Sequence, residues 1–287
     1  MKKLLSVVLT IIMMLSLPSS IASANENELT IVFTHDLHSH LDPFMLDGES
    51  RGGLARIKTI IDNTKASNKN TVVLDAGDFS MGTLFQSSYT TAAIEYRMLG
   101  LLGYDATIFG NHEFDYGFDS VKDMINTAKA SEESLPPILC ANINAAESSI
   151  NESELNQLNI YKYKIIQTND YTVAVFGVLG PDAVELSSSS NLVFNDYIES
   201  SKSVISEIKG LYSPDFIICL SHGGTGSDVD DEDIKLAKAV DGIDVNTDDG
   251  KLQYEEVYRF PNGLIDKKDE LSGSLTAIYI RINELQK

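Results

Sequence analysis

Short apolar runs alternate with helix-length segments from residue 29 onward, and this alternation predicts the secondary structure. The run 29–36 is rich in β-branched residues, which is typical of strands. The segments 70–78 and 105–113 are also interpreted as strands. The segments 52–67 and 90–104 carry apolar residues three and four positions apart, which predicts amphipathic helices. The first half of the chain is therefore expected to alternate strand and helix.

The same pattern continues to residue 245. Strands are predicted at 136–143 and 215–224, and as two strands around an Asn-Asp turn within 159–180. Helices are predicted at 118–134 and 196–212, and 231–245 is interpreted as a helix followed by the start of a strand. Polar residues 145–156 are expected to form a loop. Such alternation indicates an α/β fold. Continuous apolar strands are buried on both faces, so we expect a layered sandwich with helices outside.

Residues 1–24 have the pattern of a signal peptide. Lys2 and Lys3 precede an apolar run of 14 residues, Leu4–Leu17, and the small residues Ala22 and Ala24 fit a cleavage site. The run is shorter than the roughly 20 residues that span a bilayer. We therefore expect a secreted or extracytoplasmic protein without stable membrane insertion. The oligomeric state is not indicated.

The net charge of −20 limits the partners of the protein. An acidic chain repels polyanions, which argues against a nucleic-acid polymer as partner. A small anionic substrate requires cations in its site. The two cysteines, Cys140 and Cys219, end apolar runs, and we favour two buried free thiols over a disulfide.

Polar residues of the kind that bind metals follow four of the predicted strands. All five histidines lie in these segments. The residues concerned are His35, Asp36, His38 and His40 after the first strand, Asp78 after the second, Asn111, His112, Glu113 and Asp115 after the third, and His222 after the last. Open α/β sheets bind ligands at the carboxyl ends of their strands. Each residue alone has a structural explanation, such as a turn at Asp78 or a helix cap at Asn111.

Taken together, these residues match the chemistry of a two-metal centre. Divalent ions such as Mn²⁺ or Zn²⁺ accept carboxylate, imidazole and amide-oxygen ligands. Two such ions, bridged by one carboxylate, neutralise a phosphate ester and activate water. An acidic protein can bind an anionic substrate in this way.

The ordered motifs "FTHDLHSHL", "GGLARI", "DAGDFSMGTLF", "YDATIFGNHEFDYG", "CANI" and "LSHGG" resemble those of the calcineurin-like metallophosphoesterases. Within that family they are most similar to the secreted 5′-nucleotidases and 2′,3′-cyclic-nucleotide phosphodiesterases. The resemblance implies a four-layer αββα sandwich, assigned to residues 25–245 and incomplete at its C-terminus. It also implies two divalent metal ions and a small, nucleotide-like phosphorylated substrate.

The resemblance further implies a role for each site residue. Asp36 and His38 would hold the first metal, Asp78 would bridge both, and Asn111 and His222 would hold the second. The Asn111 amide would also lie near the substrate phosphate. His112 would be catalytic rather than a ligand, oriented by Asp115. Glu113 is expected to support the loop.

The chain departs from the family after residue 245. The family's Gly-His-x-His motif is absent, because no histidine follows His222. Residues 246–287 form an atypical tail, whose segment "DDGKLQYEEVYRFPNGLIDKKDE" is similar to the start of bacterial rhamnulokinases; no kinase activity is assigned. A solvated acidic turn is favoured over substitute ligands at Asp244, Asp248 and Asp249. Residues 273–285 are predicted to form a strand.

Three functional hypotheses are therefore open. The first is an exported binuclear-metal phosphoesterase that hydrolyses nucleotide-type phosphate monoesters. The second is a truncated or chimeric relic of that family with little or no activity. The third is a secreted, non-catalytic binder of phosphate or metal.

Overall fold

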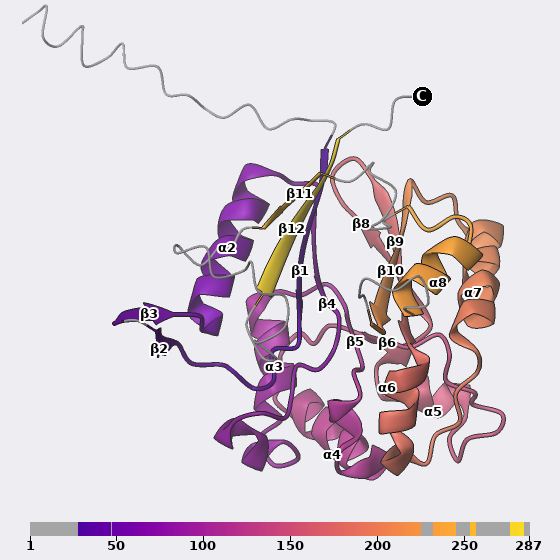
Figure 1. Cartoon of the computed structure of the whole chain (residues 1–287), viewed down its shortest axis with the longest axis horizontal. Helices are drawn as coiled ribbons and strands as arrows, with labels where there is room; N and C mark the ends of the chain where they lie inside the picture. The colour runs from indigo at the N-terminus through magenta and orange to yellow at the C-terminus, as the bar shows by residue number, and fades with distance from the viewer. Residues whose placement is uncertain (1–27, 47, 225–231, 245–252, 257–275, 284–287) are drawn as a thin grey trace, which may run out of the picture.

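A computed structural model describes five parts of the chain, and two β-sheets faced by helices form its framework (Figure 1). The described residues are 28–46, 48–224, 232–244, 253–256 and 276–283. The predicted signal peptide, residues 1–24, lies outside these residues. Among the described residues, no helix is both long and apolar enough to cross a membrane.

The first sheet is built on β1 and β4, which run parallel. Thr30 pairs with Thr71 and Thr34 with Asp75, so the two strands end together. A bridge between Leu74 and Ala106 continues the sheet toward three short parallel strands. The strands are β1 (Glu28–His35), β4 (Thr71–Asp75), β5 (Thr107–Ile108), β6 (Ile138–Leu139) and β7 (Ile160–Tyr161). All four residue pairs of β5–β6 and β6–β7 are parallel, as strand–helix alternation predicts.

The second sheet has the order β10-β9-β8. The strands β8 (Tyr163–Gln167) and β9 (Thr172–Leu179) form the predicted antiparallel hairpin around Asn169 and Asp170. Strand β10 (Phe216–His222) pairs in parallel with β9, so that His222 lies opposite Leu179. Buried residues of both sheets, among them Ile31, Val72 and Val175, form one apolar cluster between the sheets.

Helices cover the outer face of each sheet. The main helices are α2 (Leu54–Ser67), α3 (Ile94–Leu102) and α4 (Gly117–Ala130) on the first sheet, and α7 (Tyr197–Leu211) and α8 (Glu232–Ala239) on the second (Figure 1). Separate apolar clusters lie under each set of helices. The order helix, sheet, sheet, helix confirms the predicted four-layer αββα sandwich. Gly103 caps the C-terminal end of α3 with φ 86°, in the left-handed region that glycine adopts without strain.

Several shorter elements complete the fold. They are the hairpin β2 (Phe44–Leu46) and β3 (Glu49–Arg51), the 3₁₀ turns η1 (Leu84–Ser88), η2 (His112–Phe114) and η3 (Ser188–Ser190), and the helices α5 (Glu152–Gln157) and α6 (Pro181–Leu186). The loop predicted at 145–156 was therefore wrong in part. Asn151 and Glu154 form a reciprocal capping box at the start of α5, and Leu155 is the buried residue of this short helix.

The strand predicted to begin within 241–245 is not formed at residues 241–244. Gly242 adopts φ 93° and turns the chain there. Asp244 nevertheless lies beside β10, because its backbone N–H donates to the Ile217 carbonyl and its side chain accepts from the Ile217 N–H. This residue thus holds the edge of the second sheet. Asp244 is exposed in a bend, as the predicted acidic turn requires, and this contact with β10 comes in addition.

The tail contributes two strands to the first sheet. Strand β12 (Thr276–Asn283), which falls in the strand predicted at 273–285, pairs antiparallel with β1 from Glu28–Asn283 to His35–Thr276. Strand β11 (Gln253–Glu256) pairs with β12 on the other side. The sheet order is therefore β11-β12-β1-β4, and β1 is an interior strand. The free cysteines Cys140 and Cys219 are unpaired, as favoured from the sequence.

Candidate metal centre

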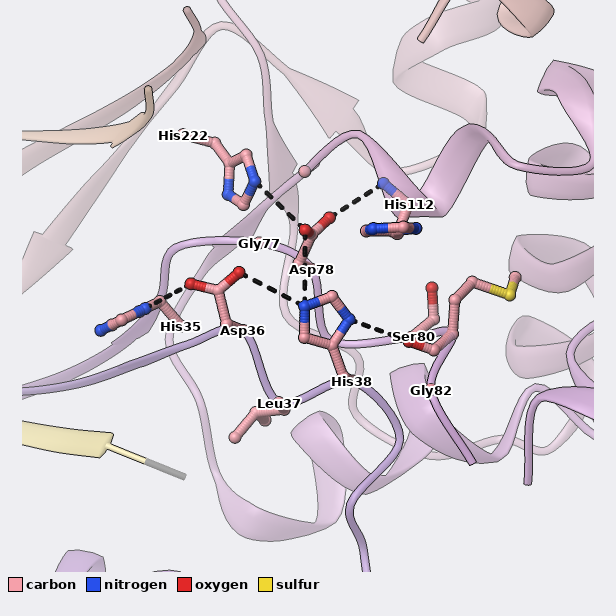
Figure 2. A network of polar contacts seen from close by, with 12 residues as sticks. His35, Asp36, Leu37, His38, Gly77, Asp78, Ser80, Gly82, His112 and His222 are labelled. Carbon is pink, nitrogen blue, oxygen red and sulfur yellow. Dashed lines mark hydrogen bonds and ion pairs between the residues drawn. The ribbon is translucent and has the colours of Figure 1, made fainter. Parts of the chain in front are cut away.

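Polar side chains from four strand-end loops converge at one edge of the sandwich (Figure 2). Asp36 and His38 follow β1, Asp78 follows β4, His112 begins η2 after β5, and His222 ends β10. Strands β1 and β4 are paired in register, which brings their two loops together. The structure thus brings residues from all four of these segments together.

The backbone of this region is strained. Asp36, His38 and Asp78 adopt φ values of 52°, 43° and 52°, in the left-handed region that residues with a Cβ atom avoid. Such conformations cost about 1–3 kcal/mol each and cluster at functional sites. Hydrogen bonds from Asp36 N to Gly77 O and from His38 N to Asp78 O hold the two loops in this conformation. The strained loop backbone therefore lowers the stability of the folded state, and the same conformation places these side chains in the site.

Asp78 lies at the centre of the group and is only 3% exposed. Its Oδ2 atom lies 3.3 Å from His222 Nε2 and 3.8 Å from His38 Nε2. Its Oδ1 atom accepts a hydrogen bond of 2.9 Å from the backbone N–H of His112. One buried carboxylate thus faces both sides of the site.

Two imidazole rings are oriented by backbone carbonyls. His38 Nδ1 lies 2.8 Å from Met81 O, and His222 Nδ1 lies 2.8 Å from Ala76 O. A carbonyl accepts only from a protonated nitrogen, so each Nδ1 carries hydrogen and each Nε2 points into the site. Histidines that bind metals are typically oriented in this way by a partner on the second ring nitrogen.

The site has a strongly negative potential. The hydrogen bond with Asp36 raises the pKa of His38 to about 9, against the opposing effect of burial. Burial would lower the pKa of His222, but hydrogen bonding to Asp78 and the charge of that residue raise it to about 9. Burial likewise would raise the pKa of Asp36, yet contacts with His35 and His38 hold it well below its ordinary value. Cations are therefore favoured at the Nε2 atoms.

The arrangement fits two divalent ions. Ligand atoms of Asp36, Asp78 and His222 all lie within 4.8 Å of one another, and so do those of His38, Asp78 and His112. Asp78 belongs to both groups, which is the position of a bridging carboxylate. Oxygen and imidazole ligands suit Mn²⁺ and Zn²⁺. The chain's own side chains can therefore hold a pair of ions.

The half-exposed pair His112 and Asp115 completes the site. His112 Nδ1 lies 3.0 Å from Asp115 Oδ2, and the two side chains are 41% and 40% exposed. The ring of His112 meets that of His38 edge to face, with centroids 5.1 Å apart. Asn111 directly precedes His112 and occupies the N-cap position of η2, without a side-chain cap hydrogen bond. An exposed imidazole backed by a carboxylate is suited to move a proton.

The loop that carries His112 is fixed by Glu113, whose side chain is fully buried. Its carboxylate accepts hydrogen bonds from the backbone of Gly110, Asp78 and Ser80 and from the Ser80 hydroxyl, at 2.7–3.0 Å. Burial, followed by the charge of Asp78, raises the pKa of Glu113 to about 7. The loop-supporting function expected of Glu113 matches these contacts.

The structure brings several of the predicted ligands close to one another. Asp36 Oδ1 lies 3.5 Å from His38 Nε2, the pair that the resemblance assigned to one metal. The groups of three closely spaced ligands also join Asp36 with His222 and His38 with His112. The ring of His112 thus lies in a ligand group as well as beside Asp115. Which role each side chain has stays a prediction.

Other contacts were not found from the sequence. His35, named there without a role, contacts Asp36 Oδ2 through Nδ1 at 2.5 Å. Ser80 joins the network of Glu113. Ala76 and Met81 act through main-chain oxygens, which no residue type signals. The alternation of strands with ligand-type residues locates the loops, but it does not reveal these partners.

An αββα sandwich with carboxylates and imidazoles at its strand ends defines the class of metal-binding phosphoesterase domains. The sequence profile described as calcineurin-like phosphoesterase matches residues 29–245. The chain belongs to the calcineurin-like phosphoesterase family.

Similar proteins are nucleotide phosphoesterases of greater length. The chain is 33% identical to human 5′-nucleotidase over 227 residues, which covers 76% of this chain and 37% of that protein. It is 29% identical over 239 residues to the trifunctional nucleotide phosphoesterase YfkN of Bacillus subtilis, covering 76% of this chain and 15% of that protein. The solved structure of a 5′-nucleotidase precursor from Thermus thermophilus superposes with a TM-score of 0.61 and 33% identity, over 73% of this chain and 39% of that one. The chain thus spans less than half the length of these relatives.

Proposed function

We propose that the protein is an exported, two-metal phosphoesterase that hydrolyses nucleotide-type phosphate monoesters. The observation that carries the proposal is the buried carboxylate of Asp78, which is shared by two groups of ligand atoms. The names of the similar proteins, 5′-nucleotidase and nucleotide phosphoesterase, support the substrate class. The leader-like residues 1–24 support export.

Asp36, His38, Asp78, Asn111 and His222 would hold the ions. When bound, two divalent ions neutralise the charge of a phosphate ester and make water a better nucleophile. The acidic chain can then admit an anionic substrate that its own charge of −20 would repel. The carbonyls behind His38 and His222 keep both imidazoles in one tautomer and orientation.

His112 donates a proton to the leaving oxygen of the ester. Asp115 contacts Nδ1 of the ring at 3.0 Å, which leaves Nε2 available to the substrate. The carboxylate stabilises the protonated ring and fixes its orientation, as in other acid–base pairs. Asn111, the residue before His112, would contact the phosphate through its side-chain amide.

The proposal is tested by metal content and turnover on the same preparation. The purified full chain is loaded with Mn²⁺ or Zn²⁺, its metal content is measured by elemental analysis, and hydrolysis of 5′-AMP is followed by phosphate release. Two ions per chain with turnover that His112→Ala abolishes are expected. Two bound ions without hydrolysis of 5′-AMP, a 2′,3′-cyclic nucleotide or p-nitrophenyl phosphate would overturn the catalytic proposal.

A second candidate is a relic of the family that keeps the fold but has little activity. It is favoured by the small number of side chains at the centre, since each ligand group has three members and shares Asp78. The absence of histidine after residue 222 points the same way. One weakly bound ion or none in the elemental analysis would support this candidate. Metal binding with no turnover that depends on His112 would favour the non-catalytic binder.

A further inference from the structure

The carboxylate of Glu113 joins the two loops that carry Asp78 and His112. Its Oε1 atom accepts from the Ser80 N–H at 3.0 Å and from the Ser80 hydroxyl at 2.7 Å. Its Oε2 atom accepts from the Asp78 N–H at 3.0 Å and from the Gly110 N–H at 2.7 Å. Each carboxylate oxygen therefore accepts two hydrogen bonds. The donors lie in loops at the ends of two different strands.

The connection between the loops is reciprocal. Glu113 accepts a hydrogen bond from the backbone of Asp78, while the side chain of Asp78 accepts one from the backbone of His112. The loop after β5 thus positions Asp78 through Glu113, and the loop after β4 positions His112 through the side chain of Asp78. Tyr89 fixes the position of Glu113 itself, because its hydroxyl donates to the Glu113 carbonyl at 3.0 Å.

The two loops approach so closely that little movement is tolerated. A Cβ atom on Gly110 would lie 2.1 Å from Asp78 Oδ1, and one on Gly77 would lie 2.6 Å from the Gly110 nitrogen. Asp78 also has the strained φ of 52°. Its backbone therefore needs an external partner to stay in place, and the buried carboxylate of Glu113 supplies one.

We propose that Glu113 is a positioning residue that sets the metal affinity of the centre by fixing the Asp78 carboxylate relative to His112. This inference rests on the proposed function, because it takes Asp78 as a shared ligand. A carboxylate is required at this position. It can accept from three N–H groups and one hydroxyl at once, whereas a glutamine amide directs N–H groups of its own at the same donors.

The test compares Glu113→Gln with a matched core variant. The Mn²⁺ affinity of the full chain is measured from the electron paramagnetic resonance signal of free aqueous Mn²⁺, and the melting temperature is recorded without metal. Removal of a partner behind a metal ligand typically weakens binding about 10–100-fold, and this range is expected for Glu113→Gln. The control Val204→Ala makes a cavity under α7, on the far side of the second sheet, and should leave Mn²⁺ affinity unchanged.

A second variant keeps the test decisive if Glu113→Gln does not fold. Ser80→Ala removes one of the four contacts, and we expect Mn²⁺ binding to weaken roughly three- to tenfold. Unchanged Mn²⁺ affinity in Glu113→Gln, or in Ser80→Ala where only that variant folds, would overturn the inference. Weakening equal to that of Val204→Ala would also overturn it, as a general effect of lost stability. A wild-type chain that binds no Mn²⁺ would instead refute the proposed metal centre.

Discussion

The buried carboxyl group of Asp75 should make the stability of the protein depend on pH in an unusual direction. Asp75 ends β4 with no exposed surface, and its carboxylate accepts hydrogen bonds from Thr34 Oγ1 and Thr107 Oγ1, both at 2.7 Å, and from the Gly77 N–H. Burial penalises the charged form more than these hydrogen bonds favour it. The pKa of Asp75 is therefore raised from 3.8 to about 6.

The sign of the effect follows from proton linkage. The folded state binds this proton more tightly than the unfolded state, so the contribution of Asp75 is fully present below pH 3.8 and is lost as pH rises through about 6. A difference from 3.8 to about 6, at about 1.4 kcal/mol for each unit of pKa, corresponds to about 3 kcal/mol. This is a large share of the roughly 5–15 kcal/mol that stabilises a typical domain.

The variant Asp75→Asn isolates this contribution, because an amide stays neutral throughout. Urea unfolding of wild type and variant at pH 4, 5, 6 and 7, with a chelator present, gives the difference in free energy of unfolding at each pH. This difference should shift in favour of the variant by about 2.4 kcal/mol between pH 4 and pH 7, because part of the effect is already lost at pH 4. Asp119→Asn, at a side chain that is 92% exposed, should give a flat difference. A flat or reversed difference for Asp75→Asn would refute the reasoning.

Three further predictions concern the site and its support. His112→Gln should lower kcat for 5′-AMP about 10²–10⁴-fold with Mn²⁺ affinity unchanged, as for loss of an acid–base group; a fall in Mn²⁺ affinity, measured by resonance titration, would make His112 a ligand instead. Asp78→Asn should abolish stoichiometric binding of both ions, because both ligand groups share this residue; retention of two ions in elemental analysis would contradict that. Asn142→Ala should lower the free energy of unfolding by about 1–3 kcal/mol, because it leaves the paired N–H and carbonyl of Leu179 buried without partners; unchanged urea midpoints would show that water replaces the amide.

The position of the site was predictable from the sequence because polar residues of the kind that bind metals follow the apolar run of each of these strands. His38, Asp78 and His222 directly follow apolar runs, and parallel strands bring their carboxyl ends to one edge. The helices were likewise predictable where apolar residues recur at helical spacing over many residues, as in α4 and α7. Residue type and spacing contain this information without knowledge of the fold.

Other features depend on contacts that the sequence does not specify. The grouping of Asp36 with His222 depends on how the two sheets pack, which periodicity does not encode. The carbonyls of Ala76 and Met81 are present in every residue type, so their contacts with imidazoles have no sequence signal. The short helix α5 was missed because its polar residues resemble a loop, although its capping box is visible in the sequence.

The ladder between β1 and β12 has a consequence for the evolution of the chain. Main-chain groups join the two strands along all eight residues of β1, from Glu28 to His35. Many sequences of suitable length and β-propensity can fill a place that is held by main-chain hydrogen bonds, whereas the loop around Asp78 tolerates few changes. A different terminal strand can therefore take the place of β12 beside β1 without changes in the loops that carry Asp36 and Asp78.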